Sequence, residues 1–343
     1  MRPPHAIDRP IFITGSGRSG TTLLRMMLNA HPEIHISNEA AYYLHASRAA
    51  TSGEWLRAYQ RTVSFAWMKF SPREIEQQVP RDLPRHEIYK AIDALMRLKA
   101  AHYDKKRYGD KMPGYGWRLG RIFADFPNAR IIHVVRDPIA TVASLKRMPW
   151  APRSIVLNSL MLAGHHARME KYRDRILEIR LEDLLDSPER MMRTSLEFVG
   201  VEWNDRVLRH QEFAPRDDMP PFPWFVAVRE KPSRGAGLPP PNFPALTRAE
   251  ITLVEYFNRR TMRRFGYHGA AFAPAAALAG MLYVFKDFPL LCRDLCRMTR
   301  AWWALRSAAH AQQLLWPHES AWKYYPEFNP QDVTTWENDS PRD

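Results

Sequence analysis

The feature that most constrains the fold is a short apolar run, a glycine-rich loop and a helical stretch in immediate succession near the start of the chain. Residues 11–14 are apolar or β-branched, the loop reads GSGRSG, and leucines and methionines recur at helical spacing over residues 21–30. Such a loop directs backbone N–H groups and the positive end of the helix dipole at an anion. The succession therefore predicts a buried strand, a turn that binds an anion and a helix.

Further along, short apolar runs alternate with stretches of helical periodicity. Strands are expected at residues 34–36, 131–135 and 176–181, and helices at residues 40–70, 85–104, 187–198 and 247–265. This alternation is typical of a parallel sheet covered on both faces. We therefore predict an α/β fold, a P-loop-like parallel sheet flanked by helices on both faces, with a helical C-terminal extension.

Two segments stand apart from this alternation. Residues 215–244 are rich in proline and are expected to form a lid or a linker. From about residue 269, alanines give way to basic and aromatic residues. We expect an α/β domain over residues 8–268 and a helical extension over residues 269–343. Within the extension, residues 275–307 resemble a basic amphipathic helix, which could contact an acidic membrane surface, its own domain or a second subunit.

Three kinds of ligand fit the first loop. As G-x-G-x-x-G, with Glu39 downstream as a ribose-binding carboxylate, the loop indicates an NAD(P)-dependent oxidoreductase. As a P-loop it has Thr21 in place of lysine, and Asp137 is the acid that could serve Mg²⁺ in a kinase. In the third interpretation the loop backbone, the Arg18 guanidinium and neighbouring hydroxyls bind an anion directly.

A second motif favours the anion. Arg136 ends the apolar run 131–135, and Ser144 lies about two turns into the following helical stretch. Because ligands of open parallel sheets bind at the carboxyl ends of the strands, this pair and the first loop should face one crevice. A ligand with phosphates at both ends would match it. The alternative is that Arg136 only pairs with a nearby carboxylate.

Together, GSGRSGTTLLRMMLNAHPEI and VVRDPIATVASLKR resemble the PAPS-dependent sulfotransferase superfamily. The first stretch is most similar to the tyrosylprotein sulfotransferase-like branch and its bacterial relatives, and YGDKMP at 108–113 resembles a G-[DE]-K-[TS]-P motif of bacterial members. The resemblance covers roughly residues 8–268. It implies that the first motif binds the 5′-phosphosulfate of PAPS and the second its 3′-phosphate. The binding residues that it implies are Gly17, Arg18, Ser19, Gly20, Thr21, Thr22, Arg136 and Ser144.

The resemblance also implies a reaction, the transfer of a sulfonate group from PAPS to an acceptor hydroxyl with release of PAP and without a metal. Glu39 falls at the position of the base, with His35 as the alternative, and Lys111 falls near the sulfonate. Lys111 and Arg18 would offset the charge that develops on the leaving phosphate. Met112 departs from the family pattern, since a hydroxyl residue is common there.

Other residues are open to two interpretations. A set of aromatic side chains could stack on the acceptor or belong to the core, namely Trp55, Tyr59, Trp67, Trp150, Trp224 and Phe225. Lys231 and Arg234 could close over the nucleotide. His31 is expected to be structural, and His165 and His166 are expected on a helix surface.

The overall charge agrees with an anionic partner. Fifty Lys and Arg against 37 Asp and Glu give a net charge of +13, which suits nucleic acid, phospholipid or a phosphate-rich ligand. With PAPS as that ligand, no nucleic acid is expected.

The two cysteines and the apolar segments bear on the cellular location. Cys292 and Cys296 have no metal-ligand companions and suit a reducing compartment. Without a visible signal peptide, and with an uncharged run at 269–285 too short to span a bilayer, a cytoplasmic protein is expected.

Overall fold

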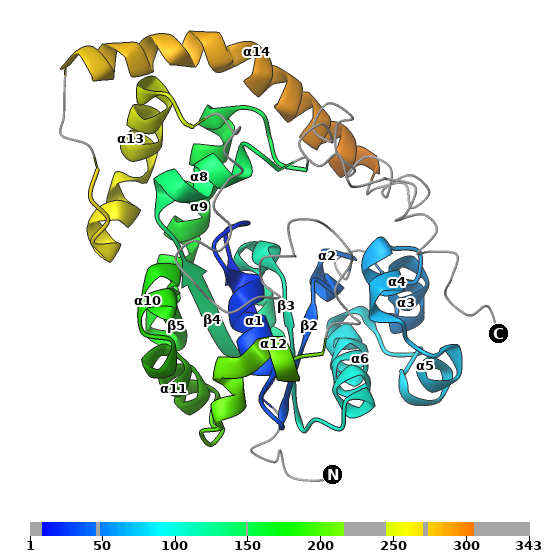
Figure 1. Ribbon diagram of the computed structural model, residues 1–343. Helices are drawn as coiled ribbons and strands as arrows, with labels where there is room; N and C mark the ends of the chain where they lie inside the picture. The colour runs from blue at the N-terminus through cyan, green and yellow to red at the C-terminus, as the bar shows by residue number, and fades with distance from the viewer. Residues whose placement is uncertain (1–8, 46–48, 149, 216–244, 270–273, 305–343) are drawn as a thin grey trace.

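The computed structural model describes residues 9–45, 49–148, 150–215, 245–269 and 274–304, and its centre is a sheet of five parallel strands (Figure 1). The strands are β1 (Ile11–Gly15), β2 (Ile34–Asn38), β3 (Arg107–Lys111), β4 (Arg130–Val135) and β5 (Ile176–Arg180). Their order across the sheet is β2-β3-β1-β4-β5. The strand that leads into the glycine-rich loop is therefore the central one.

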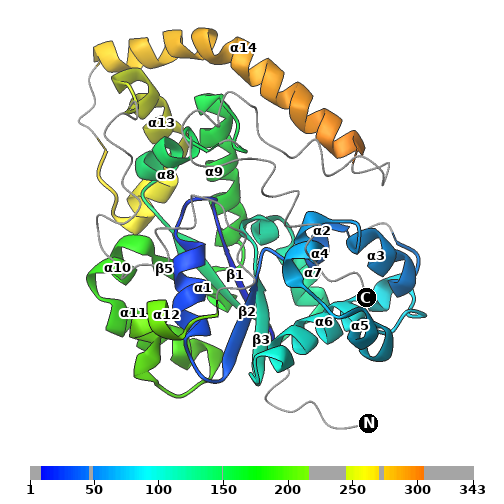
Figure 2. The same ribbon diagram turned by 45° about the vertical axis from the view of Figure 1, so that its right-hand side comes forward.

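Helices cover both faces of the sheet, as predicted, because alternate strand side chains enter two separate cores. In β1, Phe12 belongs to one hydrophobic cluster, while Ile11 and Ile13 belong to the other. One face carries α1 (Thr21–Asn29), α10 (Leu181–Asp186) and α11 (Pro188–Val199). The other carries α3 (Ser52–Tyr59), α6 (Ile88–His102) and α7 (Leu119–Asp125), as Figure 2 shows.

The remaining helices follow local sequence signals. They are α2 (Tyr42–His45), α4 (Val63–Met68), α5 (Pro72–Gln78), α8 (Pro138–Leu145), α9 (Ile155–Glu170), α12 (His210–Phe213), α13 (Arg248–Phe265) and α14 (Pro274–Ala304). Pro138 opens α8, where its missing N–H costs nothing. Thr247 and Glu250 form a capping box at the start of α13.

Among the strands of the sheet, β3 is the one that the sequence did not indicate. Its sequence, RYGDK, has neither an apolar run nor alternation, yet all five residues are buried between β1 and β2. Gly109 is required here because a Cβ atom at this position would lie 1.8 Å from the carbonyl oxygen of Ile11. The prediction that His165 and His166 lie on a helix surface is wrong. Both lie on α9 and are almost fully buried. Helix α9 packs against α13, and the rings of both histidines contact the ring of His133 in β4.

The predicted helical extension is present as α14, which contacts α13 and α9. It arches over the upper end of the molecule in Figures 1 and 2, above α8 and α9. In the described part of the chain no helix is both long and apolar enough to cross a membrane. Cys292 and Cys296 are free thiols on α14. Lys231, Arg234, Trp224 and Phe225, with the rest of segment 216–244, lie outside the described residues.

Candidate functional site

The strand register brings the two predicted anion-binding motifs together. Gly15, the last residue of β1, is the register partner of Val134 in β4. Arg136, two residues further along, therefore emerges beside the loop that follows β1. On the other side of β1, Lys111 ends β3 and is the partner of both Ile13 and Asn38. The order β2-β3-β1-β4 thus places four strand ends along one edge, as expected for a ligand site of a parallel sheet.

The loop from Ser16 to Gly20 is shaped to expose the start of α1. Gly20 is the N-cap residue, with φ +96°, and offers no side chain to cap the helix. The first N–H groups of α1 are therefore available to a bound anion. Leu181 packs so closely under Gly20 that a Cβ atom there would lie 2.5 Å from its Cδ1. Both conformation and space require glycine at this position.

The hydroxyl residues of the loop and of the first turn of α1 differ in role. Ser19 is buried, and both its N–H and its hydroxyl donate to the carbonyl oxygen of Ser16, at 3.2 and 2.7 Å. Its hydroxyl therefore closes the loop. Thr21 is buried and Thr22 is half-buried in the first turn of α1. The predicted loop residues are thus adjacent in space, and their backbone is the part that a ligand could reach.

Two arginines donate to Ser144, and a third binds the backbone of one of them. Arg18 donates from Nε to Ser144 Oγ at 3.1 Å, and Arg147 donates to the same oxygen at 3.3 Å. Arg136 donates to the carbonyl oxygen of Arg18 at 3.0 Å. Among the described residues Arg136 forms no salt bridge, but burial lowers the pKa of its guanidinium and the nearby carboxylates of Glu182 and Asp137 oppose that shift. Sequence reasoning singled out Arg18, Arg136 and Ser144 but missed Arg147, whose one signal was its position a single turn after Ser144.

A second polar centre lies at the ends of β2 and β3. Lys111 Nζ and Glu39 Oε1 are 2.6 Å apart, and the Lys111 side chain is completely buried while that of Glu39 is 27% exposed. Burial lowers the pKa of the Lys111 ammonium, and the attraction and hydrogen bond to Glu39 oppose that shift. An exposed carboxylate edge beside a buried cation is suited to accept a proton from a ligand hydroxyl.

The Glu39 backbone is held in an uncommon conformation. Glu39 and Ala41 have φ of +55° and +57°, which L-residues adopt at a cost of about 1–2 kcal/mol each. Glu39 N–H donates to the Lys111 carbonyl at 2.7 Å, and Ala40 N–H donates to Asp110 Oδ1 at 3.1 Å. Burial raises the pKa of the Asp110 carboxyl to about 6, although the Tyr115 hydroxyl and the Ala40 N–H bind it and oppose the shift. Sequence reasoning assigned no role to Asp110, which anchors the turn that carries Glu39.

Of the remaining candidates, His35 lies apart from this centre. It sits near the start of β2, fully buried, and its ring stacks on that of Tyr103 with centroids 4.3 Å apart. His31 is structural, as expected, because it bonds the Glu202 carbonyl and the Glu33 N–H. Asp137 caps α8 by accepting from Ala140 N–H at 2.7 Å, so it has a structural use that does not involve Mg²⁺.

The aromatic candidates divide into two groups. Trp55, Tyr59 and Trp67 are buried in the core formed with α3, α4 and α6. Trp150 is 38% exposed and covers the loop, since a Cβ atom at Gly17 would lie 2.8 Å from its Cη2. Among the described residues, no group of three or more His, Cys, Asp or Glu side chains could hold a metal ion.

The fold defines a P-loop-like α/β protein with its candidate site at the carboxyl edge of a parallel sheet. A family model described as "Sulfotransferase family" matches residues 10–205, more than half of the chain. The chain therefore belongs to the sulfotransferase family.

Relatives with known names support the same membership. The chain is 29% identical over 218 residues to a protein-tyrosine sulfotransferase of Drosophila melanogaster, an alignment that covers 59% of this chain and 40% of the relative. It is 30% identical over 226 residues to protein-tyrosine sulfotransferase 1 of Homo sapiens, covering 60% of this chain and 55% of the relative. The chain thus spans about half the length of these relatives or less.

Two of the solved structures that the chain partly matches are sulfotransferase domains. One is the sulfotransferase domain of the Synechococcus PCC 7002 olefin synthase, with a TM-score of 0.48 and 22% identity over 75% of this chain and 97% of that domain. Another comes from the curacin biosynthetic pathway, with a TM-score of 0.49 and 20% identity over 76% of this chain and 98% of that domain.

Proposed function

We propose that this protein transfers the sulfonate group of PAPS to a hydroxyl group of an acceptor and releases PAP. The observation that carries the proposal is the arrangement of two cationic centres along one sheet edge. Lys111 and Glu39 lie at the ends of β3 and β2, and Arg18, Arg136 and Ser144 lie at the ends of β1 and β4. The glycine-rich loop runs between them, so a single ligand with two anionic ends can bind both.

The binding roles follow from this order. The backbone of Gly17, Gly20, Thr21 and Thr22 holds the 5′-phosphate at the start of α1. Arg136 and Ser144 bind the 3′-phosphate, which distinguishes PAPS from ATP. Arg18 lies on the same side, bonded to Ser144. The Arg18 side chain would therefore bind the 3′-phosphate through its guanidinium and contact the phosphosulfate.

In the transfer step, the acceptor oxygen bonds to sulfur while the bond from sulfur to the bridging phosphate oxygen breaks. Glu39 accepts the hydroxyl proton, a contribution of roughly 10²–10⁴ in rate. Lys111, 2.6 Å from Glu39, stabilises the charge that develops on the departing phosphate oxygen. Glu39 is favoured over His35 because Glu39 contacts Lys111 directly, whereas His35 stacks on Tyr103 nearer the other end of β2.

The kinase and oxidoreductase interpretations agree less well with the contacts of Asp137 and Glu39. In a kinase, Asp137 would have to bind Mg²⁺, but its carboxylate caps α8. In an oxidoreductase, Glu39 would have to bind a ribose, but it is paired with the buried Lys111. Membership of the sulfotransferase family supports neither alternative.

The acceptor class remains to be assigned by experiment. Carbohydrates, lipid-linked molecules, small alcohols or phenols, and peptide tyrosines all carry a suitable hydroxyl. The last is included because relatives named protein-tyrosine sulfotransferase align with about 60% of this chain.

The direct test combines binding with transfer. The melting temperature is measured with PAP, ATP and NADPH, and radiolabelled PAPS is then supplied with each acceptor class and with extracts of the source cells. We expect PAP to stabilise the protein most strongly, and label to appear on an acceptor in a reaction that needs Glu39. Stabilisation by NADPH or ATP with no response to PAP would refute the proposal.

A further inference from the structure

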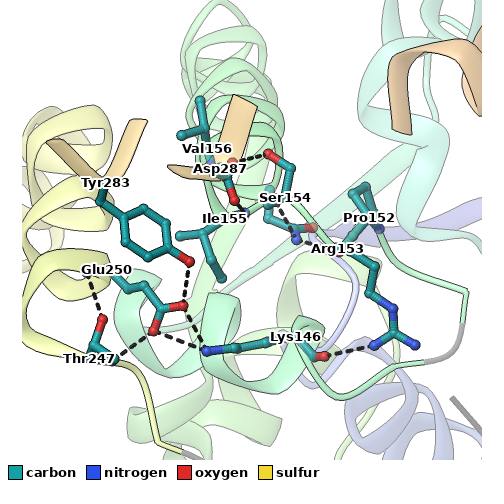
Figure 3. Close-up of polar contacts among 11 residues, drawn as sticks. Lys146, Pro152, Arg153, Ser154, Ile155, Val156, Thr247, Glu250, Tyr283 and Asp287 are labelled. Atoms are coloured by element: carbon teal, nitrogen blue, oxygen red, sulfur yellow. Dashed lines mark hydrogen bonds and ion pairs between the residues drawn. The ribbon is translucent and has the colours of Figure 1, made fainter. Parts of the chain in front are cut away.

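Helix α14 is fixed to the α/β domain by polar contacts. Asp287 accepts from the N–H groups of Ile155 and Val156, both at 3.2 Å, and from the hydroxyl of Ser154 (Figure 3). Asp294 accepts from the N–H groups of Arg153 and Ser154 at 2.6 and 2.9 Å. Both aspartates are buried, and they satisfy the N–H groups at the start of α9.

A third polar contact lies on the same side of α14, the side that faces the α/β domain. The hydroxyl of Tyr283 donates to Glu250 at 2.7 Å, and Glu250 also binds Lys146 at 2.8 Å (Figure 3). Tyr283, Asp287 and Asp294 recur at intervals of four and seven residues, so they share one face of the helix. The face of α14 that meets the rest of the protein is therefore anchored by three polar side chains, with the half-buried Leu291 between the two aspartates.

The opposite face of α14 is apolar. We call it the outer face of α14, and its exposed large side chains are Leu282, Phe285, Phe288 and Leu295. Phe285 is 78% exposed and Leu282 is 60% exposed. This is the reverse of an ordinary surface helix, which turns its apolar stripe to the core and its polar residues to water. Exposed large apolar side chains gathered on one helix in this way mark a binding surface.

The charges on the outer face are of one sign. Lys286, Arg293 and Arg300 are exposed on the helix. Asp287 and Asp294 are the only acidic residues of α14, and both are buried against α9. We propose that the outer face of α14 binds the surface of an anionic lipid bilayer, with its phenylalanines among the acyl chains and its cations at the phosphates.

A second copy of the chain fits this surface less well. In a symmetric dimer the same face meets itself, so cations would oppose cations with no carboxylate on either helix face to neutralise them. An anionic bilayer supplies apolar volume and negative charge in the same layer.

The position of α14 in the molecule agrees with binding to a bilayer. Helix α8 begins three residues after the carboxyl end of β4, and α14 lies above α8 and α9 in Figures 1 and 2, so α14 is on the side of the molecule to which the carboxyl ends of the strands point. Membrane binding would hold the candidate site near the lipid surface.

The test is flotation of the full chain with vesicles of phosphatidylcholine alone and of phosphatidylcholine mixed with phosphatidylglycerol. The first variant, Phe285→Ser with Phe288→Ser, removes apolar contact from exposed positions without altering the core. The second, Lys286→Glu with Arg293→Glu, reverses two charges. The matched control, Lys171→Glu with Arg190→Glu, makes the same charge change at exposed positions beyond the far end of α9 and on α11.

We expect the wild type and the control to bind the anionic vesicles, with binding weakened by salt. The charge variant should bind at least about thirtyfold more weakly, since each basic residue near the surface contributes about 1 kcal/mol and two are lost. The phenylalanine variant should lose binding while keeping the melting temperature of the wild type. Absence of binding to anionic vesicles, equal loss in the control, or a dimer in solution that the phenylalanine variant dissociates would overturn the proposal.

Discussion

The replacement Glu39→Gln separates proton transfer from nucleotide binding. It keeps the size of the side chain and a carbonyl oxygen that can accept from Lys111, but it removes the negative charge 2.6 Å from a completely buried ammonium. Removing one partner of a buried ion pair costs about 3–5 kcal/mol. Because Glu39 is 27% exposed and glutamine retains an acceptor, we expect a smaller loss of folding free energy, about 1–3 kcal/mol.

The effect on binding should have the opposite sign. Without Glu39, Lys111 loses the main group that opposes the lowering of its pKa and keeps the weaker attraction of Asp110, so an anionic ligand would replace part of the lost negative charge. PAP affinity should therefore be unchanged or higher in Glu39→Gln. Turnover, in contrast, should fall by roughly 10²–10⁴, equivalent to about 2.7–5.5 kcal/mol of activation free energy.

The assay uses isothermal titration with PAP and label transfer from radiolabelled PAPS, both at a fixed salt concentration. Glu87→Gln is the control, because it also removes a carboxylate 2.8 Å from a lysine, but in a solvent-exposed pair that contributes little to stability. The control should match the wild type in both measurements. Wild-type turnover in Glu39→Gln would exclude Glu39 as the base, and a parallel loss of PAP affinity and turnover would make its role structural.

Three further predictions concern stability, each measured by chemical denaturation. Gly109→Ala should destabilise the protein by about 3 kcal/mol or more, because the added methyl would collide with the Ile11 carbonyl; a loss under about 1 kcal/mol would contradict the packing of β3 against β1. Burial lowers the pKa of His166, so the folded chain keeps it neutral while the unfolded chain takes up a proton as the pH falls below about 6.5. The stability lost between pH 7.5 and 5.5 should therefore be about 1.4 kcal/mol smaller in His166→Gln, and an equal loss in both proteins would show that this histidine is protonated in the fold. Asp287→Ala should cost about 1–3 kcal/mol by leaving N–H groups of α9 without their acceptor, and wild-type stability would mean that α14 does not hold the start of that helix.

The parts of the fold that could be predicted from the sequence are those whose residues serve packing alone. Apolar runs revealed β1, β2, β4 and β5, and the stretch of helical periodicity over residues 247–265 revealed α13. Strand β3 was not predicted because its last two residues, Asp110 and Lys111, are ionisable, which is unusual for a buried strand. Those groups are bound by Tyr115, five residues after Asp110, and by Ala40 and Glu39, which are 70 and 72 residues from their partners in β3, and a local pattern does not reveal these contacts.

The candidate site shows the same division. Short motifs were sufficient to place Arg18, Arg136 and Ser144 together, because the carboxyl ends of adjacent parallel strands meet at one edge. The contribution of Arg147 depends on which way a side chain turns from the end of α8, and the anchoring of Glu39 by Asp110 depends on contacts across strands. Burial of His165 and His166 likewise depends on α13 closing over α9, which periodicity within α9 alone does not reveal.

The most direct test of the two-ended anion site is the affinity for PAP compared with that for AMP, which lacks the 3′-phosphate, in the wild type and in Arg136→Ala. Because Arg136 would donate a charged hydrogen bond worth about 1.5–3 kcal/mol, PAP should bind the wild type roughly 10- to 150-fold more tightly than AMP, and Arg136→Ala should lose most of that preference while its AMP affinity changes little. Equal affinity of the wild type for the two nucleotides, or a preference for PAP that survives in Arg136→Ala, would contradict the account.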